Sequence, residues 1–139
     1  MRRAHLLAFV VALALALPAA AADKKKPAVH KITQSPSYLM IDPIYTAIIE
    51  DEKPSGLLMV GIGLDVPNKE LRDKAEQAMP LLRDAYVRSL LTFTASSVRS
   101  WRQPDVGEIA DRLQHVTDRA LGKTGAHILL AQVAMRLTK

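Results

Sequence analysis

Histidine is the residue with the broadest chemical use in this chain, because it can bind metals and transfer protons near neutral pH. The chain has no cysteine, so a thiol nucleophile and a thiolate metal site are both excluded. No two histidines have the spacing of metal ligands on one element. The four are His5, His30, His115 and His127. We therefore predict neither a catalytic residue nor a bound metal.

Two glycine motifs have a superficial likeness to nucleotide-binding sequences. Gly61-Ile62-Gly63 begins like a dinucleotide motif, but the third glycine is missing and the residues lie within a predicted strand. Gly122-Lys123-Thr124 resembles the end of a phosphate-binding loop, but Thr117 stands where that loop requires a glycine. We interpret the first motif as close packing by a helix or a partner and the second as a helix end. No cofactor is predicted.

The remaining polar and aromatic candidates favour contacts over catalysis. No serine lies in a nucleophile-elbow motif, and the acidic run at 50–52 reads as a solvated turn. Trp101, the single tryptophan, lies between Arg99 and Arg102. We expect its ring to pack the loop onto the helices, with contact to a partner as the alternative. Gly61, Gly63 and Trp101 are therefore the candidate interface residues.

The N-terminus has the pattern of a secretory signal peptide. Arg2 and Arg3 precede an apolar run of 12 residues at 6–17, which ends in Pro18 and four alanines. We predict a signal peptide at 1–22, and the alternative is an uncleaved membrane anchor of 17 apolar residues at 6–22. Either reading places the remaining chain outside the cytoplasm.

Length, charge and composition limit the number of domains and the classes of partner that the exported part can have. Its length is that of one ordinary domain, and its net charge falls from +5 to +3 once Arg2 and Arg3 are removed. This mild positive charge and an aromatic content of 4% do not indicate a nucleic-acid partner.

The pattern of apolar residues predicts one domain at 38–139 after a flexible linker at 23–37. We expect a strand at 38–49 with Pro43 at an edge or a bulge, a polar turn at 50–56, and a strand at 57–66. In the second strand, alternate residues share one apolar face: Leu58, Val60, Ile62, Leu64 and Val66. Such alternation is typical of a sheet with one buried face.

Three helices and a last strand complete the prediction. Pro80 divides helices at 69–78 and 80–93, and an irregular stretch at 94–103 follows. A third helix at 105–121 begins at a capping Asp105 and ends at Gly122. Its apolar stripe contains Val106, Ile109, Leu113, Val116 and Ala120. A strand at 126–137 places Leu129, Ala131, Val133, Met135 and Leu137 on one side.

This order predicts an α+β fold. Two N-terminal strands and the C-terminal strand should form a small antiparallel or mixed sheet. About three helices should pack on one of its faces.

The layout resembles the FliL family, the flagellar basal-body-associated proteins. The resembling stretches are YLMIDPI (38–44), GLLMVGIGLDV (56–66), MPLLRDAYVRSLLTFTASSVRS (79–100), DVGEIADRLQHVTDRAL (105–121) and AHILLAQVAMRL (126–137). MPLLRDAYVRSLL is the most specific of them. Together they cover nearly all of residues 38–139.

The resemblance implies a non-enzymatic periplasmic domain similar to stomatin and prohibitin domains. It implies a FliL-like role in motility and chemotaxis at the flagellum, with the protein at the periplasmic face of the inner membrane. The implied partners are flagellar stator or basal-body proteins and further copies of the chain, as a homo-oligomer, without a cofactor. The alternative is a small exported binding or chaperone-like module unrelated to motility.

Two departures from the family pattern concern anchoring and the third helix. Family members usually carry a cytoplasmic stub and one transmembrane helix, where this chain has a short leader. Thr117-Asp118 also stands where many relatives have an Ile-Asn pair. If the leader is cleaved, association with the stator requires another tether.

Overall fold

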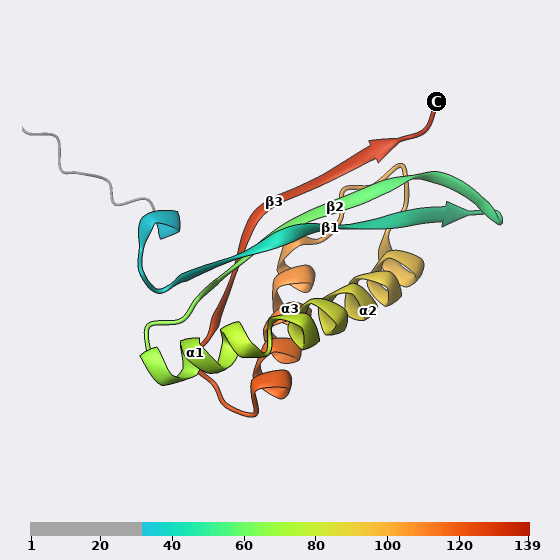
Figure 1. Cartoon of the computed structure of the whole chain (residues 1–139). Helices are drawn as coiled ribbons and strands as arrows, with labels where there is room; N and C mark the ends of the chain where they lie inside the picture. Colours follow the sequence, from blue (N-terminus) through green and yellow to red (C-terminus); the bar gives the residue numbers. More distant parts are fainter. Residues whose placement is uncertain (1–31) are drawn as a thin grey trace, which may run out of the picture.

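The computed structural model describes residues 32–139, in which three α-helices cover one face of a three-stranded antiparallel sheet (Figure 1). The strands β1 (Tyr38–Glu50), β2 (Lys53–Asp65) and β3 (His127–Leu137) lie in the order β1-β2-β3. The predicted α+β fold is therefore confirmed. The predicted signal peptide and most of the predicted linker lie outside the described residues.

The last residues of the predicted linker are joined to the sheet. Ile32–Gln34 form a short 3-10 turn, and β1 then begins at Tyr38 as predicted. The carbonyl of Ser37 accepts a hydrogen bond from the Val66 N–H at 2.8 Å. Pairing thus extends past the ends of both strands.

The hairpin between β1 and β2 is longer than the sequence predicted. Asp51 and Glu52 both have positive φ, of 49° and 64°, and a two-residue turn of this kind matches the twist of a hairpin. Because two residues suffice to reverse the chain, Lys53 already pairs with Glu50. The predicted turn at 50–56 was therefore too long.

The buried face of the sheet follows the predicted alternation in β2. All five predicted residues of that face are at most 2% exposed. In β1 the register shifts between Ile41 and Ile44, around Pro43, and the strand lies at the sheet edge. Both predicted roles of this proline, edge and bulge, are thus present.

The faces of β3 differ from the prediction because of a bulge. The register shifts opposite Gly61 and Ile62, and Ala131 is the additional residue. An inserted residue reverses the alternation beyond it. Ile128 and Leu130 before the bulge, and Val133 and Met135 after it, pack against the core. The prediction of one continuous side that includes Leu129 and Ala131 was wrong.

Two abutting helices follow the hairpin, as predicted. In α1 (Lys69–Gln77) the Asn68 side chain accepts a hydrogen bond from the Leu71 N–H. Pro80 lies in the first turn of α2 (Met79–Ser97), where its missing N–H costs nothing. α2 continues through part of the stretch predicted as irregular, because Phe93 and Thr94 are buried in its last turns.

The third helix, α3 (Val106–Leu121), has the predicted ends but a different buried stripe. The Asp105 carboxylate accepts the Glu108 N–H at 3.0 Å, and Gly122 has a left-handed φ of 63°. The buried residues are Ile109, Leu113, Thr117 and Leu121. The predicted stripe was wrong for Val106, which is exposed, while Val116 and Ala120 are partly buried beside the core.

Two buried pairs of hydroxyl groups connect the layers. The hydroxyls of Tyr86 on α2 and Thr117 on α3 lie 2.7 Å apart, and those of Thr46 on β1 and Thr94 on α2 lie 2.6 Å apart. The Thr117 hydroxyl also donates to the Leu113 carbonyl. Among the described residues, no buried side-chain polar atom lacks a partner. These pairs fix α2 against both neighbours, since a shifted helix would leave hydroxyls unsatisfied.

Candidate interaction surfaces

The residues considered for chemistry are dispersed in the structure. His115 lies exposed on α3 and His127 lies exposed at the start of β3. Within residues 32–139, no group of three or more histidine or carboxylate side chains is placed to hold a metal ion. Gly61 and Gly63 lie inside β2, and Gly122 ends α3, as predicted for both glycine motifs.

The sheet has a second face that the described helices leave uncovered (Figure 1). We call it the outer sheet face. Its large apolar residues Met40, Tyr45, Ile49 and Leu57 are 76%, 60%, 51% and 43% exposed. They lie on the same side of paired strands, since Met40 pairs with Gly63 and Leu57 pairs with Ala47. Tyr45, Ile49 and Leu57 are close in the register, since Tyr45 pairs with Met59 and Leu57 pairs with Ala47. Groups of exposed apolar residues mark interaction sites in soluble proteins.

Gly61 and Gly63, the predicted interface glycines, both belong to the outer sheet face but differ in their surroundings. A Cβ at Gly63 would lie within 3 Å of the Tyr38 ring, so the space at Gly63 is filled from β1 of the same chain. A Cβ at Gly61 would lie 3.6 Å from the Ala131 Cβ, which is ordinary contact. The close packing at Gly63 is intramolecular, whereas Gly61 can carry a side chain.

Trp101 does not pack its loop onto the helices, contrary to the expectation. Its side chain is 78% exposed in the connection between α2 and α3. Together with Ile49 and Arg99 it lines a shallow pocket of about 270 Å³ beside the end of the hairpin. Trp101 and Ile49 thus place exposed apolar surface at one end of the sheet.

Glu50 holds this loop against the hairpin. Its carboxylate accepts a hydrogen bond from the Ser100 backbone N–H at 2.8 Å. This bond lowers the pKa of Glu50, and a nearby guanidinium, that of Arg99, acts in the same direction. The ionised carboxylate therefore positions the residue that precedes Trp101.

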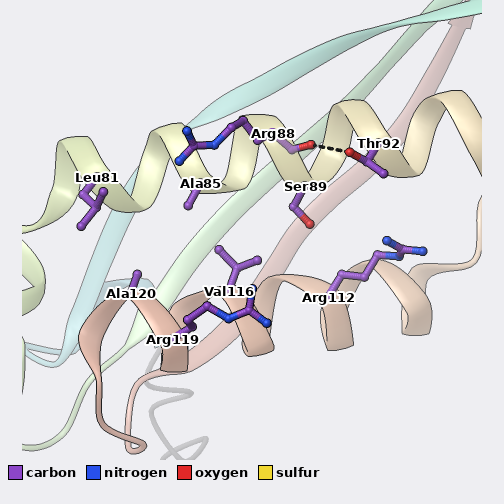
Figure 2. Close-up of a pocket in the computed structure, with 9 residues that line it drawn as sticks. All are labelled: Leu81, Ala85, Arg88, Ser89, Thr92, Arg112, Val116, Arg119 and Ala120. Carbon is purple, nitrogen blue, oxygen red and sulfur yellow. Dashed lines mark hydrogen bonds between the residues drawn. The ribbon is translucent and has the colours of Figure 1, made fainter.

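A groove of about 480 Å³ lies between α2 and α3 (Figure 2). The sequence alone does not predict it. From α2 it is lined by Leu81, Ala85, Arg88, Ser89 and Thr92, and from α3 by Arg112, Val116, Arg119 and Ala120. We call it the α2–α3 groove. Its residues recur at intervals of three and four on both helices, which was the signal available in the sequence.

Among residues 32–139, no helix has both the length and the apolar character required to cross a bilayer. No protein-family model and no curated protein matches the sequence, so the resemblance to FliL stays a prediction.

Proposed function

We propose that this chain is a non-enzymatic protein of the periplasm, or of the periplasmic face of the inner membrane, that supports flagellar motor function by self-assembly and protein contacts. The outer sheet face carries the proposal, because four large apolar side chains are exposed there on adjacent strands. Exposed apolar area of this kind is stabilised when another protein covers it. The flagellar assignment comes from the resemblance in sequence.

The open edges of the sheet favour assembly in the same way. Within the described residues, β1 and β3 each pair with β2 alone, so each has one free edge. Free edges offer backbone N–H and carbonyl groups to another strand. A second copy, or a stator or basal-body protein, could use such an edge together with the outer sheet face.

A substitution on the central strand tests the face directly. Gly61→Arg adds a long charged side chain where a Cβ meets only ordinary contacts, so the variant should fold. His115→Arg, on the exposed side of α3, is the matched control. The measurements are far-UV circular dichroism, sedimentation of the purified chain, and swimming in soft agar by a deletion strain that carries each variant.

We expect the deletion to reduce swimming without general envelope defects and the wild-type chain and His115→Arg to restore it. Gly61→Arg should be folded, fail to assemble and fail to restore swimming. Folded Gly61→Arg with normal assembly and swimming would remove the outer sheet face from the interface. Unchanged swimming of the deletion strain, with no second copy of the gene, would contradict the flagellar role. The binding module unrelated to motility would then be favoured, with the α2–α3 groove as its site.

A further inference from the structure

We infer that the α2–α3 groove binds an acidic amphipathic helix of a partner protein. This inference is independent of the proposed flagellar role, because the groove belongs to the helical layer and the outer sheet face is on the other side of the sheet. Three features of the groove support it: the apolar floor, the charges at the sides and the spacing of those charges.

The floor of the groove is mainly apolar and is formed by small side chains. Ala85 and Ser89 on α2 are directed toward α3, and Val116 is directed toward α2 (Figure 2). Leu81 at one end is 54% exposed. Small residues on two neighbouring helices let a third helix approach closely. The exposed Leu81 and the partly buried Val116 provide area for its apolar side chains.

Three arginines line the groove, and they differ in how far the chain neutralises them. Arg112 lies 2.8 Å from Glu108 and stacks over the Phe93 ring. Arg88 forms only an exposed pair with Asp84, one turn earlier on α2. Arg119 forms no ion pair among the described residues. Exposed pairs within one helix are weak, so Arg88 and Arg119 are the most open to a carboxylate from a partner. The pair of Arg112 with Glu108 is of the same kind, since both side chains are more than a third exposed, so Arg112 can also accept a partner carboxylate.

The spacing of the charges favours a helix over a lipid or a fatty acid. Arg112 and Arg119 are seven residues apart on α3, which corresponds to two helical turns and about 10.5 Å. Two carboxylates at this separation match the two arginines more closely than a single anionic headgroup does. A helix that lies along α3 with two carboxylates seven residues apart reaches both, and apolar residues between them then face Val116.

The N-terminal part of this chain is not a suitable occupant on grounds of charge. The segment before Ile32 contains Lys24, Lys25, Lys26 and Lys31, which carry the same sign as the groove. Like charges across an interface disfavour binding. The occupant is therefore an acidic segment of another protein.

A synthetic helix provides the probe. A fluorescein-labelled peptide of about 18 residues carries two glutamates seven residues apart, with leucines at the third and fourth positions after the first glutamate. A second peptide has lysine at both glutamate positions. Binding to the full chain is followed by fluorescence anisotropy at low and at physiological salt. The variants are Arg119→Glu and, as the matched control outside the groove, Arg102→Glu on the exposed loop.

We expect the acidic peptide to bind, the lysine peptide not to bind, and added salt to weaken the complex. Arg119→Glu should reduce affinity by at least about tenfold, while Arg102→Glu stays within about twofold of wild type. Circular dichroism checks that both variants are folded, and the intermediate Arg119→Gln replaces Arg119→Glu if the latter unfolds. Four results would overturn the inference: no binding of the acidic peptide, equal binding of both peptides, equal affinity for folded Arg119→Glu or Arg119→Gln and wild type, or binding only of anionic phospholipid vesicles or palmitate. A fifth result, self-association that is abolished by Arg119→Glu, would overturn it by assigning the groove to a second copy.

Discussion

The buried hydrogen bond between Tyr86 and Thr117 decides how tightly α2 is docked on α3. Thr117→Val keeps the branched shape but leaves the Tyr86 hydroxyl buried without its partner at 2.7 Å. Such a loss costs about 1–3 kcal/mol of unfolding free energy. At about 4–8 °C per kcal/mol for a domain of this size, the melting temperature should fall by roughly 4–24 °C.

Tyr86→Phe should cost less, about 0.5–1.5 kcal/mol, because the Thr117 hydroxyl still donates to the Leu113 carbonyl. The double variant should lose less stability than the sum of the two single variants, since each removes the same bond. Urea denaturation followed by far-UV circular dichroism measures all three. Thr92→Val, an exposed position on α2, is the control and should stay within about 0.5 kcal/mol of wild type. Strict additivity, or equal stability of Thr117→Val and Thr92→Val, would refute the bond.

The other predictions concern the same core, the outer sheet face and the hairpin end. Burial raises the pKa of Tyr86 to about 12, so the unfolded chain loses this proton at lower pH than the folded one does. The free energy of unfolding should therefore be unaffected below pH 10 and fall by roughly 2–3 kcal/mol as pH rises toward and through 12. Thermal melts between pH 9 and 12 should show this loss in wild type and not in Tyr86→Phe. Gly63→Ala should lower stability by about 1 kcal/mol by displacing the Tyr38 ring, and Tyr38→Ala in the same chain should restore it. Glu50→Gln should lower the fluorescence anisotropy of Trp101, and acidification of wild type below the lowered pKa of Glu50 should reproduce the change.

The sequence predicted those parts of the fold in which apolar residues recur at the spacing of only one type of secondary structure. From Val60 to Asp65, β2 alternates large apolar residues with glycine or aspartate, so its buried face could be predicted directly. β3 is apolar at nearly every position, and its alternation therefore carried no signal for the bulge at Ala131. The end of α2 was missed because serine and threonine residues follow Phe93, and these lower helix propensity until tertiary contacts compensate.

The candidate sites depend on contacts between residues that are far apart in the sequence, and the sequence did not predict these contacts. The predicted buried stripe of α3 does not include Thr117, because a threonine is buried only where a partner satisfies its hydroxyl. That partner is Tyr86, which lies 31 residues earlier in the chain, so the sequence around Thr117 does not reveal it. A glycine at position 63 predicts close packing by another element, and the ring that fills this space belongs to Tyr38 on the neighbouring strand. The α2–α3 groove appears only once the two helices are adjacent, since each contributes one side.

The outer sheet face and the α2–α3 groove share no residue, so their roles should be separable by mutation. Gly61→Arg should impair assembly and leave binding of the acidic peptide unchanged, and Arg119→Glu should do the reverse, because distant sites without common partners act additively. Loss of both properties in either single variant would mean that the sites are coupled. The core offers a route for such coupling, since Thr46 on β1 bonds Thr94 on α2, and Tyr86 of α2 bonds Thr117 on α3. Thr117→Val would then weaken the coupling without touching either surface.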